Sequence, residues 1–102
     1  MRRRSEFLRI QRQGRKVATR SFLLFLRKNG LGRARLGVTV SKRVGNAVRR
    51  NRLKRLVREV YRRHRGAFPG DADLVVVAKK TATVDSYEEV QGELLKSMRK
   101  LR

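Results

Sequence analysis

The feature that most constrains this chain is a short strand followed by a tight turn and a long amphipathic helix, all within residues 37–64. Val38 and Val40 alternate with polar residues, as in a half-buried strand. Gly45 and Asn46 suit the turn, because both tolerate backbone torsions that bulkier residues resist. Beyond the turn, apolar residues recur three and four positions apart, which predicts one apolar stripe along a helix. The residues of this stripe are Leu53, Leu56, Val57 and Val60.

The other side of this helix, which we expect over residues 46–65, is cationic. Arg55, Arg58 and Arg62 lie roughly opposite the apolar stripe. Arginines also crowd the first turn, where unpaired backbone N–H groups favour an anion such as phosphate. We therefore expect the helix to bury one side and to present the other to water or to a polyanion.

The charge of the chain is large and unevenly distributed. The formal net charge is +21 over 102 residues. Residues 1–65 hold 23 Lys and Arg against 2 acidic residues, whereas residues 66–102 hold 6 of each. Of the 29 basic residues 21 are Arg, the side chain better suited to bidentate phosphate contacts and to stacking on bases. Nucleic acid is therefore the expected partner.

A membrane surface is the alternative partner for so basic a chain, and the sequence argues against it. No stretch approaches the roughly 18 consecutive apolar residues of a membrane span. The basic helix also lacks Trp and Phe on its apolar side, where an interfacial helix would carry them. The first residues do not lead into the apolar core of a signal peptide. Together with the absence of cysteine, this predicts a cytoplasmic protein without a membrane partner.

The chain resembles the bacterial ribonuclease P protein family in the run SKRVGNAVRRNRLKRLVRE, residues 41–59. The core of that family's signature is Arg-Asn-Arg followed by Lys-Arg and Arg, found here at residues 50–52, 54–55 and 58. Weaker resemblance extends over nearly the whole chain. It comprises residues 5–7, Gly14, residues 73–79 and residues 87–89.

The resemblance implies the noncatalytic protein subunit of an endonuclease that removes the 5′ leader from precursor tRNA. In this family the RNA subunit carries the active site and holds the Mg²⁺ ions, so we expect no cofactor bound by protein ligands alone. The expected partners are the catalytic RNA, in a 1:1 complex, and precursor tRNA. By match to the family motif, the residues expected to bind the catalytic RNA are Ser41, Lys42, Arg43, Asn46, Arg49, Arg50, Asn51, Arg52, Lys54, Arg55 and Arg58.

The resemblance also implies a cleft for the single-stranded leader, formed by Phe7, Gln11, Arg15, Lys16 and Phe25. Phe7 and Phe25 match cleft aromatics of the family, and the alternative for each is a buried core side chain. Gln11 stands where many relatives have a second aromatic. It offers hydrogen bonds to a base edge or a sugar hydroxyl instead of stacking.

The pattern of elements predicts an α+β fold, a small mixed sheet with packed helices in the order α-β-β-β-α-β-α, in which the bent first strand counts as two. We expect a helix capped by Ser5, a first strand over residues 17–27 that is bent, and a second over residues 34–41. The Asn29-Gly30 turn predicts antiparallel pairing of these two strands.

The second half of the chain is expected to add a strand and a helix to the same domain. The strand spans residues 73–79, and the final helix has a capping box at Asp85 and Glu88. Gly66 is expected to end the basic helix that precedes this strand. The whole of residues 1–102 is one domain, with residues 1–4 as a flexible basic arm.

The strand before the basic helix and the strand after it should form a βαβ crossover. Such crossovers are right-handed in about 98% of cases. The resemblance implies the rarer left-handed version, in a fold similar to domain 2 of ribosomal protein S5.

The sequence contains no catalytic constellation that we can identify. His64, the single histidine, extends the apolar stripe near the helix end and is expected to cap or to pack. Asp71 and Asp73 lie two residues apart and are expected to cap or to be solvated, not to hold a metal. No catalytic or metal-ligating residue is predicted.

A second class of function fits the same size and charge, namely a small basic ribosomal protein that binds rRNA. The run from Gly45 to Glu59 favours the ribonuclease P interpretation, because a general rRNA-binding protein does not require it. The two interpretations share the prediction that the basic helix contacts RNA.

Overall fold

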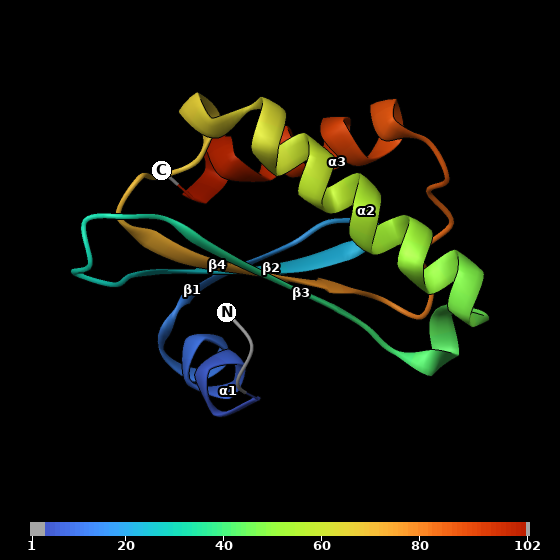
Figure 1. Cartoon of the computed structure of the whole chain (residues 1–102), viewed down its shortest axis with the longest axis horizontal. Helices are drawn as coiled ribbons and strands as arrows, with labels where there is room; N and C mark the ends of the chain where they lie inside the picture. Colours follow the sequence, from blue (N-terminus) through green and yellow to red (C-terminus); the bar gives the residue numbers. More distant parts are fainter. Residues whose placement is uncertain (1–3, 102) are drawn as a thin grey trace.

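The computed structural model describes residues 4–101 and places three α-helices on the two faces of one four-stranded sheet (Figure 1). The helices are α1 (Arg4–Gln13), α2 (Ala47–Arg63) and α3 (Tyr87–Leu101). The strands are β1 (Arg15–Ala18), β2 (Phe22–Lys28), β3 (Arg35–Val40) and β4 (Ala72–Ala78), and two 3-10 turns are η1 (Lys42–Val44) and η2 (Arg65–Ala67). The predicted α+β class and the order α-β-β-β-α-β-α are confirmed.

The larger core lies between the sheet and the helix pair α2 and α3 (Figure 1). Alternate residues of β2, which are Phe22, Leu24 and Leu26, point into it, as the period of two along a strand requires. The predicted apolar stripe of α2 packs onto this face, with Leu53, Val57 and Val60 almost fully buried and Leu56 half-buried. The stripe of α3 is buried likewise at Val90, Leu94, Met98 and Leu101.

The smaller core lies under α1 on the opposite face of the sheet. Ile10 of α1 packs there against Phe25 and Val75. Phe7 lies over Gly37 of β3, where an added Cβ would stand 2.7 Å from the Cζ atom of the Phe7 ring. Glycine at residue 37 therefore lets the ring of Phe7 approach the backbone of the sheet closely.

The strand order is β1-β2-β4-β3, so the predicted antiparallel pairing across the Asn29-Gly30 turn is wrong. The turn residues do adopt a turn, and Gly30 has φ 67°. The strand β4 lies between the two strands that the turn connects, antiparallel to β2 and parallel to β3. It is the most apolar strand, with Leu74, Val75 and Val76 nearly inaccessible to solvent, and a strand buried on both faces belongs in the centre of a sheet.

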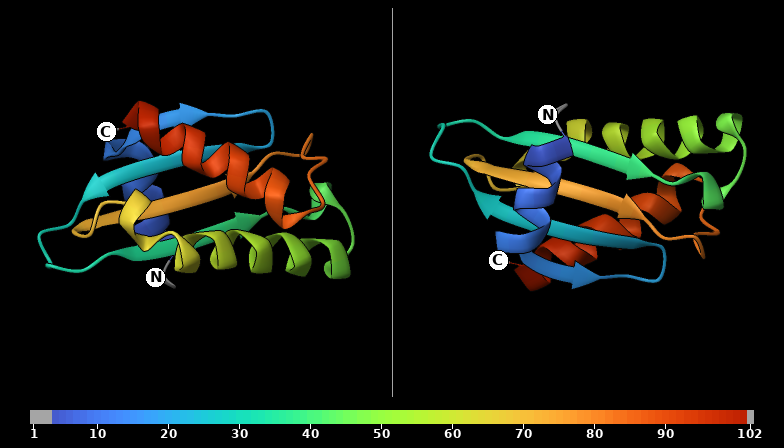
Figure 2. Two further views of the ribbon diagram at one scale, coloured as in Figure 1. Left: turned by 90° about the horizontal axis from the view of Figure 1, so that it is seen from above. Right: turned by 90° about the horizontal axis from the view of Figure 1, so that it is seen from below.

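The crossover from β3 through α2 to β4 is left-handed (Figure 2, left). In that view the helices lie in front of the sheet, both strands run to the right, and β4 lies above β3. The general preference for right-handed crossovers predicts the opposite arrangement. The handedness implied by the family resemblance is the one that the structure has.

The predicted bent first strand is in fact two strands, β1 and β2, joined by a tight turn. The amide of Thr19 donates to the carbonyl oxygen of Phe22 at 2.8 Å. Glu93 of α3 accepts from the hydroxyl of Thr19 at 2.5 Å and from the amide and hydroxyl of Ser21 at 2.9 and 2.8 Å. This carboxylate satisfies the polar groups of the turn and attaches the β1–β2 hairpin to α3.

Several predicted ends of helices are displaced by one or more residues. Arg4 is the first residue of α1, so Ser5 lies inside the helix and not at its cap, and Arg4 does not belong to a flexible arm. The other residues of the predicted arm, 1–3, lie outside the described part of the chain. The helix α2 ends at Arg63 and is capped by His64, whose amide donates to the carbonyl of Val60, and Gly66 falls within η2.

The start of α3 is capped by Ser86 together with Glu89, one residue later than the predicted pair. The amide of Glu89 donates to the hydroxyl of Ser86 at 3.2 Å, and that hydroxyl donates to the Glu89 carboxylate at 3.2 Å. Asp85 is thereby left free to interact with α2.

Candidate nucleic-acid interface

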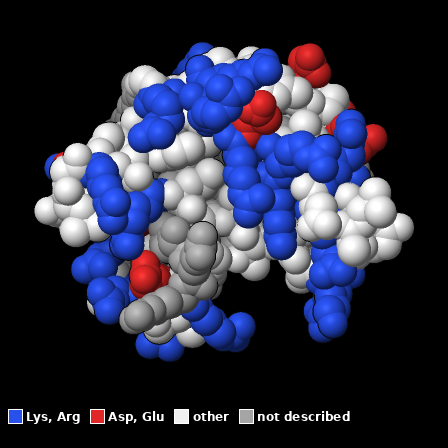
Figure 3. All heavy atoms as spheres, viewed as in Figure 1, with Lys and Arg blue, Asp and Glu red and all other residues white. Residues whose placement is uncertain are grey.

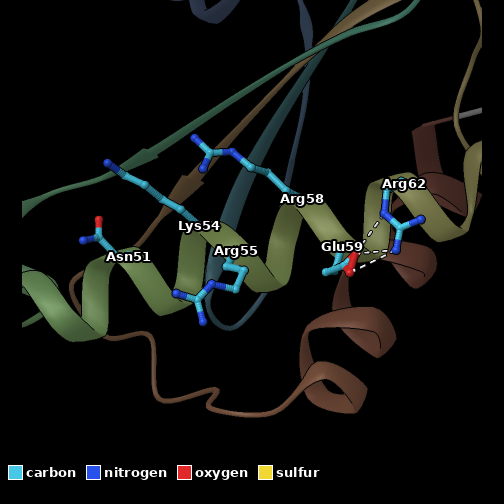
Figure 4. Close-up of a pocket in the computed structure, with 6 residues that line it drawn as sticks. All are labelled: Asn51, Lys54, Arg55, Arg58, Glu59 and Arg62. Carbon is cyan, nitrogen blue, oxygen red and sulfur yellow. Dashed lines mark hydrogen bonds and ion pairs between the residues drawn. The ribbon is translucent and has the colours of Figure 1, made fainter.

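The outer side of α2 is a row of polar and cationic side chains. We call this row the α2 ridge, and it comprises Asn51, Lys54, Arg55, Arg58 and Arg62. Together with Glu59 these residues line a shallow hollow of about 450 Å³ (Figure 4). The ridge is presented to solvent because the opposite side of the helix is buried against the sheet and α3.

Most cations of the α2 ridge have no carboxylate of their own. Among residues 4–101, neither Arg55 nor Arg58 makes a hydrogen bond or ion pair with another side chain, and both are exposed. Arg62 differs, because Glu59 accepts from its guanidinium at 2.8 Å. The unpaired guanidinium groups are the part of the ridge that is ready to bind an external anion.

Four further predicted residues lie just before α2, where the cationic surface continues. Ser41, Lys42 and Arg43 are exposed in and next to η1. Asn46 caps α2, and its Oδ1 atom accepts from the amide of Arg49 at 3.0 Å, so this amide oxygen is already used within the helix. Figure 3 shows far more Lys and Arg than Asp and Glu on the face that carries α2 and η1.

Three arginines of the predicted RNA-binding set are not free on the surface, because two are held by hydrogen bonds within the protein and the third is half-buried. Arg49 and Arg52 contact the connection between β4 and α3. Arg50 is half-buried, and its Nε atom is buried without a hydrogen-bond partner among the described residues. The structure thus separates the predicted set into free cations on the ridge and arginines that also have contacts inside the molecule.

The predicted leader residues fall into two groups, because side chains of a strand alternate between its faces. Phe7, Gln11, Lys16 and Phe25 lie on the face covered by α1, and the Nζ atom of Lys16 stands 5.9 Å from the centroid of the Phe25 ring. Arg15 lies on the other face, where its Nη1 atom donates to the carbonyl oxygen of Leu101 at 2.9 Å. The structure therefore does not bring Arg15 together with the other four.

Phe25 is buried, with only 7% of its surface exposed. Its ring packs against Ile10 and Val75, so it presents no open face on which a base can stack. Phe7 is only half-buried and keeps part of its surface accessible. Of the two alternatives for Phe25, the core side chain is therefore the one that the structure supports.

Beside α1 the same face of the sheet has a row of partly exposed residues that the sequence analysis did not single out. The strand register places Ala18, Leu23, Val77 and Thr39 side by side in this row. Leu23 and Val77 are half-buried. In Figure 3 the lower edge of the molecule is indented between α1 and η1. Since α1 leaves these residues partly exposed, they form an open apolar floor that only the strand alternation could have indicated.

A partly buried ionic network fixes α1 to the sheet at the other side of the helix. Arg35 donates from Nε and Nη2 to the carboxylate of Asp73 at 2.8 and 2.7 Å, and its Nη1 atom lies 3.1 Å from Glu6. Asn29 donates to Asp73 at 2.8 Å. The hydrogen bond from Arg35 lowers the pKa of Asp73 below its usual value, and the same bond raises the pKa of Arg35.

This network also answers whether Asp71 and Asp73 suit a metal ion. Both carboxylate oxygens of Asp73 accept hydrogen bonds from Arg35, and the side chain is 4% exposed. Within residues 4–101 no three His, Asp or Glu side chains are grouped so that they could hold a metal ion. The hydrogen bonds from Arg35 and Asn29 thus engage the Asp73 carboxylate within the protein.

His64 takes a structural position at the junction of α2 and α3. Its Nε2 atom lies 3.1 Å from Oε1 of Gln91 and 3.2 Å from the hydroxyl of Tyr87. These neighbours are uncharged, and the imidazole joins the end of one helix to the other.

Among the described helices, none is long and apolar enough to cross a lipid bilayer.

Comparison with known proteins gives one consistent family. The family model described as Ribonuclease P matches residues 1–102. The ribonuclease P protein component of Desulfovibrio desulfuricans is 47% identical in sequence, over 99% of this chain and 81% of that protein. The corresponding protein of Halalkalibacterium halodurans is 43% identical over 92% of this chain and 80% of its own length.

Solved structures lead to the same family. The RNase P protein of Thermotoga maritima superposes with a TM-score of 0.89 and 36% identity, covering 100% of this chain and 96% of that one. The RNase P protein of Staphylococcus aureus gives a TM-score of 0.86 and 32% identity, covering 99% and 94% of the two chains.

Proposed function

This chain belongs to the ribonuclease P protein family, and from that membership we propose how its two surfaces divide the binding of RNA. As a ribonuclease P protein subunit, the chain takes part in tRNA processing and has ribonuclease P RNA as its partner. The role as a ribosomal protein, considered above, is set aside by this membership. What we add is the assignment of surfaces to the RNA partner and to the substrate.

The catalytic RNA is proposed to dock on the α2 ridge and on the exposed residues of η1. The observation that carries this assignment is the set of guanidinium groups on α2 without a carboxylate partner, above all Arg55 and Arg58. Unpaired guanidinium groups bind phosphates bidentately and release condensed counterions from RNA. The N-terminus of α2, beside Lys42 and Arg43, adds the positive end of a helix dipole.

We propose that the active site lies in the RNA, which holds the Mg²⁺ ions. We also propose that the protein and the catalytic RNA form a 1:1 complex. The donor set of the described chain supports this, since its one histidine and its buried aspartate are engaged in structural contacts. The protein would then act by neutralising phosphates where two RNA molecules meet, which lowers the Mg²⁺ concentration needed for cleavage. Because tRNA processing takes place where tRNA is made, we propose a cytoplasmic location.

The 5′ leader of precursor tRNA is proposed to lie on the open floor beside α1. Leu23 and Val77 offer apolar surface there, Phe7 an accessible ring edge, and Lys16 a cation at the margin. Such a surface suits single-stranded nucleic acid, whose bases can contact apolar side chains while phosphates meet cations. Only precursor tRNA carries a leader, so this contact would distinguish substrate from product.

The test of the whole assignment is leader cleavage at low Mg²⁺ by bacterial ribonuclease P RNA, with and without this protein. We expect cleavage to be faster with the protein, and equal rates would refute the proposed role. The leader site is tested by Lys16→Ala with Arg15→Ala as its matched control, because the two side chains are neighbours on opposite faces. Lys16→Ala should weaken binding of precursor but not mature tRNA. Equal effects of both substitutions would exclude the floor as the leader site.

A further inference from the structure

The connection between β4 and α3 is attached to the first turns of α2 by two arginines of the family signature. Figure 2 (left) shows this connection passing beside the end of α2 where the helix begins. Arg49 donates from Nη2 to the carbonyl oxygens of Ala82 at 2.9 Å and Val84 at 3.3 Å. Arg52 donates from Nε to the carboxylate of Asp85 at 2.9 Å and from Nη2 to the carbonyl of Asp85 at 2.7 Å.

The carboxylate of Asp85 lies between both guanidinium groups. Its Oδ1 atom is 3.6 Å from Nη1 of Arg49 as well as 2.9 Å from Nε of Arg52. The contact is open to water, since the side chain of Asp85 is 66% exposed and that of Arg52 51%. An anion held by two arginines at the start of a helix has the surroundings that an RNA phosphate would have there.

We propose that Asp85 is an intramolecular competitor for RNA: its carboxylate occupies a phosphate site made by Arg49 and Arg52 and is displaced when the RNA docks. The inference rests on the proposed function, which places RNA on this part of α2. It adds a residue outside the signature that opposes binding, whereas the signature residues promote it.

Two features distinguish Asp85 from a structural carboxylate such as Asp73. First, the two pairs differ in exposure. Asp73 is 4% exposed, so its separation from Arg35 would leave a buried charge unpaired and would destabilise the fold. The pair of Asp85 with Arg52 is exposed and contributes little to stability. Second, the hydrogen bonds from Arg49 to the carbonyls of Ala82 and Val84 do not involve the Asp85 side chain. The connection therefore stays attached to α2 when that carboxylate swings away.

The substitution Asp85→Asn removes the competing charge and keeps an oxygen that can accept from Arg52. We expect it to tighten binding of ribonuclease P RNA about fivefold at ~0.1 M salt, the factor for one unit charge about 4 Å away in water. The gain should shrink at ~0.5 M salt, because screening weakens exposed charges. Affinities would be measured by filter binding or fluorescence anisotropy across a salt series.

Two matched variants separate local competition from a general gain in charge. Asp71→Asn makes the same change in net charge at an exposed aspartate before β4, and it should change the affinity much less. Asp85→Glu keeps the charge and should not tighten binding. Thermal unfolding of each variant, followed by circular dichroism, shows that the fold is retained.

The proposal is overturned if Asp85→Asn binds RNA equally or more weakly than the parent protein, or if Asp71→Asn tightens binding as much. It is also overturned if Asp85→Glu tightens binding, since charge would then not be the cause. Arg55→Ala, measured beside them, tests the proposed function separately. If Arg55→Ala weakens binding while Asp85→Asn has no effect, the α2 ridge remains the RNA site and only the competitor is wrong.

Discussion

Arg35 at the sheet edge and Arg55 on α2 carry the same guanidinium group in opposite circumstances. Arg35 directs all of its terminal nitrogens at Asp73 and Glu6, and it fixes α1 to the sheet. Arg55 is exposed and has no such partner among residues 4–101. With 29 basic and 8 acidic residues, most cations of this chain cannot be paired. The positions of the few carboxylates therefore decide which arginines stabilise the fold and which remain for RNA.

The largest effect is expected when the paired arginine, Arg35, loses its partner. Asp73→Asn leaves Arg35 without its buried counterion and should lower the free energy of unfolding by about 2 kcal/mol, less than for a fully buried pair because Arg35 is partly exposed. Urea denaturation measures this. The exposed Asp71→Asn serves as control and should change stability by less than about 0.5 kcal/mol. Equal stability of the two variants would mean that the network does not hold α1.

The next effect concerns the unpaired side. The double substitution Arg55→Ala and Arg58→Ala should weaken binding of ribonuclease P RNA roughly tenfold and reduce the slope of log affinity against log salt by about 1.4–1.8, for two lost phosphate contacts. Unfolding by urea should be unaffected. Arg99→Ala with Lys100→Ala removes the same charge from the end of α3 and is the control. A slope that falls equally in both double variants would assign the effect to net charge.

A smaller effect separates the two regions by pH. The pKa of Asp73 is lowered in the folded protein, so its stabilising contribution is present above the unfolded value of about 3.8 and is lost as the pH falls through the lower folded value. The free energy of unfolding should therefore drop on acidification below about pH 4. In Asp73→Asn this drop should be smaller. Parallel curves for the two proteins would show that other carboxylates cause the loss.

The smallest expected effect tests an intermediate case on the α2 ridge. Arg62 is exposed like Arg55 but is held by Glu59 at 2.8 Å. Arg62→Ala should therefore reduce the salt slope less than Arg55→Ala does, because part of its charge is already neutralised. Titrations of the two single variants over the same salt series give the comparison. If Arg62→Ala has the larger effect, pairing with a carboxylate does not predict which arginines bind RNA.

The sequence predicted the elements of the fold well and their neighbours in the sheet poorly. Periodicity identifies a strand or a helix from local spacing, and the buried stripe of α2 lies where it placed it. The turn at Asn29-Gly30 is also a local feature, and it is present in the structure. No local signal predicted that β4 would lie between β2 and β3. That insertion depends on the burial of both faces of β4, which is a property of the assembled sheet.

The candidate site shows a similar division. The exposed cations of α2 could be predicted, because an amphipathic helix fixes which side faces solvent. The partners of Arg49, Arg52 and Arg35 could not, since their carboxylates and carbonyls come from residues at least 29 positions away. The strand alternation that separates Arg15 from Lys16 was readable, but only once the strand was known to begin at Arg15.

The contact of Phe7 with Gly37 means that the close approach of this ring to the sheet depends on the absence of a side chain at residue 37. A side chain at residue 37 would place its first carbon 2.7 Å from the Cζ atom of Phe7, so the ring would have to move away from the sheet. The width of the gap beside Leu23 and Val77 can thus be altered from a position that does not line it. A substitution at this glycine would change how much room single-stranded RNA has beside Phe7, and it would leave every α2 cation in place.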